Sequence, residues 1–104
     1  ELVKVRGALI NPAIVFELLS ADRAIREFQL LLRKEDPGRA DSLDELVVRL
    51  EAPEAERARL AAEVPPQVQR AVMVRPRVEF AAPGEIHDPL KSVKARRFLD
   101  ERRG

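Results

Sequence analysis

The chain has 104 residues, 45% of them apolar, and its 19 basic side chains nearly balance 18 acidic ones, giving a net charge of +1. This length supports one small domain, and the charge balance provides no global field to attract nucleic acid or an anionic membrane. The lack of cysteine excludes disulfides and thiolate metal sites, and no apolar run approaches the roughly 18 residues of a membrane span. We therefore expect a cytoplasmic protein that binds neither nucleic acid nor membrane.

The first patterned segment is Leu2–Ile10, where apolar residues alternate on either side of a glycine. This alternation, with Gly7 at its centre, predicts a β-hairpin or a bulged strand. Asn11 and Pro12 then predict a helix start, because Asn accepts a backbone N–H bond and proline already holds the helical φ angle. The helix should end within Ser20–Ala24, and its apolar stripe is expected to be Ile14, Leu18 and Ala21, with Val15 and Leu19 beside them.

Two further strands are predicted at Phe28–Arg33 and Glu45–Glu51, because every second residue in each is apolar and would face the core; these residues are Phe28, Leu30 and Leu32 in the first and Leu46, Val48 and Leu50 in the second. The segment between them, Glu35–Ser42, is rich in turn-forming residues. Strands joined only by a loop usually pair with each other, so these two should form an antiparallel hairpin.

A second helix is predicted to begin at Pro53 and to stop at Pro65 and Pro66, since proline has no N–H to donate in a helix interior. After one further helical turn, Val72–Phe80 predicts a third core strand with a bend at Pro76. We interpret 81–90 as a loop, and the last half of 92–102 as helical.

These elements predict an α+β fold of ferredoxin-like outline. Its core would be a three-stranded antiparallel sheet with two helices on one face, preceded by the N-terminal hairpin.

Five segments together resemble the C-terminal domain of phenylacetate–CoA ligases and their relatives, which are adenylate-forming acid–CoA ligases. These segments are KVRGALINPAIVFELL (4–19), FQLLL (28–32), LDELVVRLE (43–51), VEFAAPGEI (78–86) and KARRFLD (94–100). The resemblance implies that residues 1–104 are the mobile C-terminal domain of a larger ligase, the AMP-binding enzyme C-terminal type, with the N-terminal catalytic domain absent from this sequence.

In such a ligase, ATP and a carboxylic acid form an acyl-adenylate, and CoA then displaces AMP to give a thioester. The resemblance thus implies ATP, CoA and Mg²⁺ for the full-length enzyme, with none of them bound to this fragment alone, which should be inactive. It also implies a partnership with the N-terminal catalytic domain, an aryl or arylacetic acid as substrate, and a possible homodimer.

The resemblance assigns the catalytic lysine of adenylation to Lys94. An ammonium on a flexible stem suits this role, because adenylation develops negative charge between the substrate carboxylate and the α-phosphate. Val93 stands where the family has glycine, and the preceding loop is longer than usual. Lys91 is therefore a rival for the same role.

The resemblance assigns the loop that faces the pantetheine arm of CoA to Arg6, Gly7 and Ala8. Glycine lets the backbone approach a narrow ligand closely and adopt a positive φ angle. No metal site is predicted, because His87 is the single histidine and lacks the usual set of partner ligands.

Two functions from other classes compete with the ligase interpretation. One is a regulatory α+β module of the ACT type, which binds a small effector between subunits. The other is an RNA-binding sheet, which would need exposed aromatic residues, whereas Phe28 and Phe80 are predicted to face the core.

Overall fold

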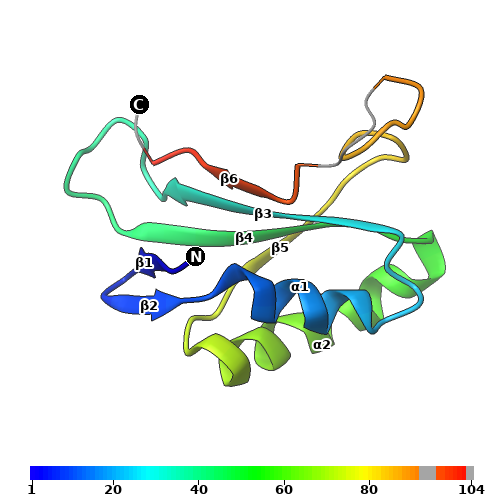
Figure 1. Ribbon diagram of the computed structural model, residues 1–104, viewed down its shortest axis with the longest axis horizontal. Helices are drawn as coiled ribbons and strands as arrows, with labels where there is room; N and C mark the ends of the chain where they lie inside the picture. The colour runs from blue at the N-terminus through cyan, green and yellow to red at the C-terminus, as the bar shows by residue number, and fades with distance from the viewer. Residues whose placement is uncertain (92–95, 103–104) are drawn as a thin grey trace.

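The computed structural model describes residues 1–91 and 96–102 and shows two helices beneath a twisted sheet (Figure 1). The elements in chain order are β1 (Val3–Val5), β2 (Ala8–Ile10), α1 (Pro12–Ser20), β3 (Glu27–Lys34), β4 (Asp44–Glu51), α2 (Glu54–Val72), β5 (Arg77–Phe80) and β6 (Phe98–Asp100). β1 and β2 form a separate hairpin, while the large sheet has the order β5-β4-β3-β6. The core lies between this sheet and the helices and continues under the hairpin through Val5 and Ile10.

The predicted α+β class, the two helices on one face and the N-terminal hairpin are confirmed (Figure 1). β3 and β4 also pair antiparallel as expected, in a register that runs from Glu27↔Glu51 to Lys34↔Asp44. The sheet differs from the prediction in having a fourth strand and in being mixed. β5 pairs parallel with β4, because α2 carries the chain back across the sheet before β5 starts.

The prediction that α2 stops at its two prolines is wrong. Pro65 and Pro66 lie inside the helix, which continues to Val72 and ends at Met73 in the left-handed conformation (φ 68°). Its buried face spans both sides of the prolines, and this packing outweighs the missing backbone bonds; the buried residues are Leu60, Val64, Pro65, Val68 and Val72. The following strand therefore begins only at Arg77.

The helix predicted near the C-terminus is also absent from the described residues there, because Phe98–Asp100 form β6. β6 pairs parallel with β3, and Leu30 N donates to Arg97 O (2.7 Å) on this edge. Without β6, the backbone groups of this β3 edge would lack strand partners. β6 forms because it supplies hydrogen-bond partners to the backbone groups along this edge of β3.

The buried face of α1 differs from the predicted stripe. Val15 and Leu19 are fully buried, whereas Leu18 is half-buried and Ile14 is 43% exposed. Most residues of this short helix are apolar, so its sequence does not determine which side of the helix faces the core. Packing against α2 and β3 selects the face that carries Val15 and Leu19.

Leu19→Ala should destabilise the domain by about 2–5 kcal/mol, because removal of a fully buried leucine side chain leaves a cavity. Leu18→Ala in the adjacent, half-buried position is the matched control and should cost clearly less. Chemical denaturation of the two variants measures the difference. An equal loss of unfolding free energy would contradict the orientation of α1.

Candidate functional site

The loop predicted to face CoA is a two-residue turn between β1 and β2. Val5 pairs with Ala8, so Arg6 and Gly7 are its two central residues, with φ angles of +50° and +82°. Positive φ at both positions is the signature of a type I′ hairpin turn. A Cβ on Gly7 would meet no atom of the described chain within 4 Å, so within this domain the backbone angle, not crowding, favours glycine.

Arg6 occupies a backbone conformation that non-glycine residues seldom adopt, and its side chain is held by two hydrogen bonds. Its Nε donates to the backbone oxygen of Asp44 (2.7 Å), and its Nη2 donates to Glu35 Oε1 (2.6 Å). The guanidinium therefore faces the end of the β3–β4 hairpin. Ala8 begins β2 and is half-buried.

A cavity of about 340 Å³ lies beside this turn, and half of its lining residues are basic; the lining is Lys4, Arg6, Gly7, Lys34, Ser42, Leu43, Asp44 and Arg102. Asp44 is its acidic residue and accepts hydrogen bonds from Lys34 (2.9 Å) and Arg102 (3.0 Å). Burial alone raises the pKa of the Asp44 carboxyl, but these two bonds outweigh burial and hold that pKa below its usual value. The pKa of Arg102 is raised above its usual value, chiefly by the hydrogen bond from its guanidinium to Asp100.

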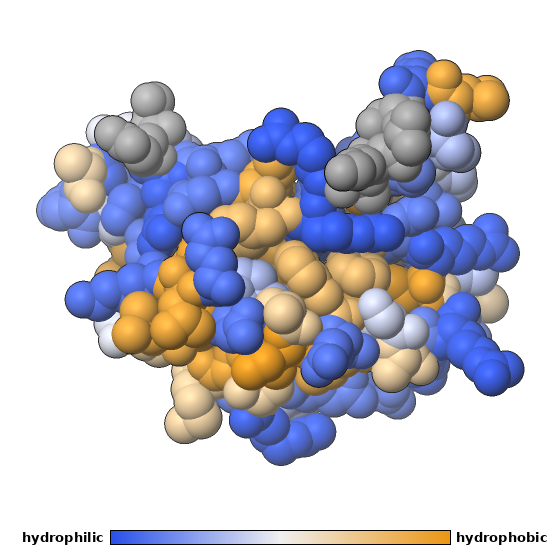
Figure 2. Space-filling view, in the orientation of Figure 1, coloured by the Kyte–Doolittle hydropathy of each residue, from blue (hydrophilic) through white to orange (hydrophobic). Residues whose placement is uncertain are grey.

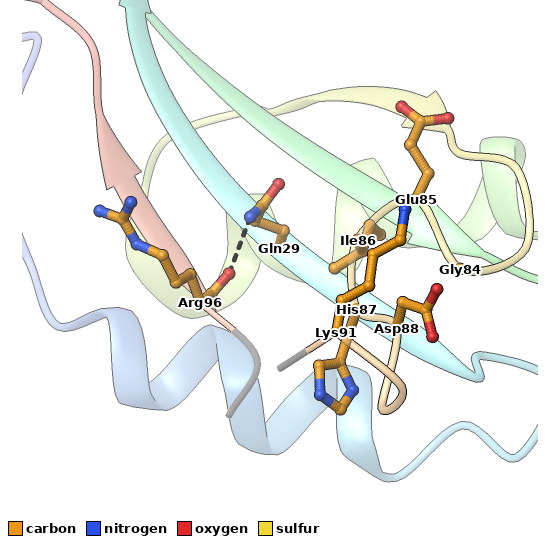
Figure 3. Close-up of a pocket in the computed structure, with 8 residues that line it drawn as sticks. All are labelled: Gln29, Gly84, Glu85, Ile86, His87, Asp88, Lys91 and Arg96. Carbon is orange, nitrogen blue, oxygen red and sulfur yellow. Dashed lines mark hydrogen bonds between the residues drawn. The ribbon is translucent and has the colours of Figure 1, made fainter. Parts of the chain in front are cut away.

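Lys94 lies outside the described residues, but the described residues on either side of 92–95 border a second cavity. This cavity of about 410 Å³ is lined by Gln29, Gly84, Glu85, Ile86, His87, Asp88, Lys91 and Arg96. Lys91 is exposed. Figure 3 shows Gln29 and Arg96 joined on one side, with Lys91 and Asp88 on the other.

Gln29 anchors the chain just after this segment, a role that the sequence did not reveal. It is only 5% exposed; its Nε2 donates to Arg96 O (2.8 Å), and its Oε1 accepts from Arg49 Nη1 (3.1 Å). Strand alternation marks Gln29 simply as a polar position. One available signal was that Gln29 is the single uncharged polar residue in an otherwise apolar stretch of β3.

Arg97 provides a second anchor that sequence reasoning missed. Its Nη1 donates to Glu27 Oε1 (2.6 Å) and to Phe28 O (2.9 Å), and the guanidinium carbon lies 4.5 Å from the centre of the Phe28 ring. An arginine over an aromatic face adds cation–π attraction to the ion pair. Arg97, the residue just before β6, is thus held against the start of β3.

The Arg6–Gly7 turn and Arg96, the first described residue after Lys94, lie toward opposite ends of β3. Arg96 contacts Gln29 near the start of the strand, whereas Arg6 contacts Glu35 and Asp44 beyond its end. The five residue-to-residue steps from Gln29 to Lys34 span about 17 Å. Figure 1 shows the same separation, with the β1–β2 turn and the start of β6 on opposite sides of the molecule.

Two further polar residues, Glu45 and His87, have partners in the sheet. Glu45 pairs with Arg33 (3.2 Å) and Arg77 (3.3 Å), and His87 Nδ1 lies 3.8 Å from Glu27 Oε2. Within 1–91 and 96–102, no group of three or more His, Asp or Glu side chains is placed to hold a metal ion. In the same residues no helix is long and apolar enough to cross a membrane.

The family model described as the AMP-binding enzyme C-terminal domain matches residues 7–102. The chain belongs to this family. The resemblance to the C-terminal domain of adenylate-forming acid–CoA ligases is thereby confirmed, and the family match extends from the Gly7 turn to Arg102. The comparison with curated proteins finds no match.

The solved structures similar to this family member include those of two acid–CoA ligases. A domain of phenylacetate-coenzyme A ligase from Bacteroides vulgatus ATCC 8482 has a TM-score of 0.79 at 20% identity, covering 99% of this chain and 94% of that one, and it supports the fold alone. 2-Hydroxyisobutyryl-CoA ligase, in complex with 2-HIB-AMP and CoA in the thioesterification state, has a TM-score of 0.75 at 27% identity over 98% of this chain. The same ligase in a postadenylation state with 2-HIB-AMP has a TM-score of 0.70 at 27% identity over 97% of this chain. The chain spans 21% of the first of these ligase structures and 22% of the second.

Proposed function

We propose that this domain is the mobile C-terminal part of an acyl-CoA ligase that adenylates a carboxylic acid with ATP and then transfers the acyl group to CoA. Family membership supports the ligase assignment. A similar ligase has been solved in both a postadenylation and a thioesterification state, which supports a cycle of two half-reactions. An aryl or arylacetic acid is the proposed substrate class.

The observation that carries this proposal is the separation between the Arg6–Gly7 turn and Arg96, the first described residue after Lys94. Arg96, which is bonded to Gln29, lies near the start of β3. The Arg6–Gly7 turn lies beyond the end of β3. One fixed orientation of the domain cannot bring both ends against the same catalytic centre. Rotation of the domain against an N-terminal catalytic domain would present each end in turn.

In the first half-reaction, a carboxylate oxygen of the substrate attacks the α-phosphorus of ATP and pyrophosphate leaves. We assign Lys94 to this step, where its ammonium would stabilise negative charge on the carboxylate and the α-phosphate. Lys91, which is exposed at the neighbouring cavity, is the rival for this role.

In the second half-reaction, the thiol of CoA attacks the acyl carbonyl carbon and AMP leaves. We assign the Arg6–Gly7 turn to the passage of the pantetheine arm. Gly7 adds no side-chain volume there, and its positive φ keeps the turn tight. Ala8 continues the same strand with a small side chain.

The RNA-binding alternative is disfavoured by the covering of Phe28. The Phe28 ring lies under Arg97, and its centroid is 5.7 Å from that of Phe16. Phe80 is half-buried, with the guanidinium of Arg57 5.3 Å from its ring centre. A nucleic acid base would have to displace these arginines in order to stack.

The chain alone should bind ATP and CoA only weakly, with dissociation constants above about 1 mM, because it has no glycine-rich loop opening a helix to cradle phosphates. Isothermal titration calorimetry with each nucleotide tests this expectation. The ligase lacking this domain should in turn lose both half-reactions. Micromolar binding of ATP by residues 1–104 would place the nucleotide site here and contradict the proposal.

A further inference from the structure

The hairpin that carries the Arg6–Gly7 turn is not a part of the large sheet. β1 and β2 pair only with each other, and Val5 and Ile10 bury their side chains beneath them. Among the described residues, the hydrogen bonds that the structure shows between this hairpin and the β3–β4 hairpin or β6 come from two arginines, Arg6 and Arg102. An isolated two-stranded hairpin is marginally stable in water. These bonds therefore help to decide where the turn lies.

Arg102 reaches the hairpin from the far end of the chain. Its Nη1 donates to the backbone oxygen of Lys4 and to Asp44 Oδ2 (3.0 Å). Its Nε and Nη2 donate to the two carboxylate oxygens of Asp100 (2.9 and 2.8 Å). This paired contact fixes the plane of the guanidinium, and the side chain is only 21% exposed.

Asp44 is the residue on which both arginines converge. Its carboxylate accepts from Arg102 and Lys34, while its backbone oxygen accepts from Arg6. The Asp44 side chain is 17% exposed, so solvent screens these contacts less than at an open surface. The turn is thus held from Lys4 on one strand and from Arg6 within the turn.

Figure 2 shows this side of the molecule as a mixture of hydrophilic side chains with apolar groups from the hairpin region. Leu9 and Leu43 are exposed near the two ends of this network, at 66% and 58%. Apolar burial therefore does not fully cover the outer part of the hairpin. Polar contacts at Asp44 supply the additional restraint.

We propose that Arg102 is a positioning residue for the CoA step, because it holds the Arg6–Gly7 turn against the start of β4 through Lys4 and Asp44. The inference rests on the proposed role of the turn in CoA transfer. Arg102 acts through the turn and not on the reacting atoms. An arginine suits this role because one planar fork donates to oxygens of three residues, which a lysine ammonium on a flexible stem cannot hold in the same geometry.

The first test measures amide hydrogen exchange in the 104-residue chain. Arg102→Ala should raise exchange of the protected amides in residues 3–10 by at least about tenfold, while the core amides of α2 change by less than about twofold. Arg59→Ala is the matched control, because it removes an arginine that binds a network of similar size away from the hairpin, made by Asp22, Glu56 and Glu63. Unchanged exchange in residues 3–10 of Arg102→Ala would overturn the inference.

The second test separates the half-reactions in the ligase that carries this domain. Arg102→Ala should slow thioester formation from a supplied acyl-adenylate by about tenfold or more, with adenylation within about twofold of wild type. Retained adenylation also shows that the variant is folded. Arg102→Lys should stay impaired in the CoA step, whereas Arg59→Ala should not be.

Gly7→Leu distinguishes a failure of the positioning role of Arg102 from a failure of the proposed function of the turn. If it blocks the CoA step but Arg102→Ala does not, Arg102 has no positioning role and the proposed function stands. If Gly7→Leu leaves the CoA step intact, the proposed role of the turn fails, and the positioning role fails with it. Equal loss of both half-reactions in Arg102→Ala would identify a general structural role and overturn the inference.

Discussion

Lys94→Ala in the ligase that carries this domain should slow acyl-adenylate formation from acid and ATP by at least about 100-fold. This is the usual loss when one group that stabilises transition-state charge is removed. Thioester formation from a supplied acyl-adenylate should remain close to wild type, because the lysine is assigned to the first half-reaction only. Pyrophosphate release measures the first half-reaction, and thioester formation from the acyl-adenylate measures the second.

Lys91→Ala is the control for this prediction, since Lys91 lies three residues earlier and borders the neighbouring cavity. It should leave both half-reactions intact. If Lys91→Ala alone shows the adenylation defect, the assignment moves to Lys91 within the same proposed function. Full adenylation activity in both single variants would contradict a lysine role in this segment.

Gly7→Leu should have the opposite effect and slow the CoA step by about 10- to 100-fold, the size expected when a reacting group is misplaced by about 1 Å. A leucine side chain would project from the turn into space that the domain itself leaves open, because a Cβ on Gly7 meets no described atom within 4 Å. We expect this space to be used by the pantetheine arm. Adenylation should be nearly unchanged.

Gly7→Ala separates bulk from backbone strain. Alanine and leucine both disfavour the φ angle of +82°, but alanine adds only a methyl group. The CoA step should therefore fall much less in Gly7→Ala than in Gly7→Leu, while the two variants lose similar thermal stability. Equal kinetic losses would mean that strain in the turn, and not the width of a passage, causes the defect.

Short-range chemistry in the sequence determined several features of this domain. The positive φ of Gly7 follows from the glycine between two alternating segments, and the start of α1 follows from Asn11 and Pro12. Asn11 Oδ1 accepts from Ala13 N at 3.0 Å, as the helix-start pattern predicts. The β3–β4 hairpin follows from two alternating strands joined by a turn-rich loop. Each of these depends on residues close together in the chain.

The tertiary structure decided the features in which distant segments compete. α2 continues through Pro65 and Pro66 because its buried face, on both sides of them, packs against the rest of the core. β6 forms a strand because the edge of β3 offers unpaired backbone groups, although 92–102 contains no strong strand pattern. Local propensity is a weak term, and tertiary packing overrides it in both cases.

The contacts that hold the candidate site were likewise invisible in the sequence. Gln29 and Arg96 are 67 residues apart, and Arg102 and Lys4 are 98 apart. In the sequence, Arg102 is one member of a basic C-terminal run, which is usually a solvated surface. Its role is set by the fold, which brings the end of the chain just after β6 to Asp44 at the start of β4 and to Lys4 in the first hairpin. The sequence by itself determined the family, the turn and the hairpin elements, whereas only the three-dimensional arrangement decided which charged side chains restrain them, because those partners meet across the whole chain.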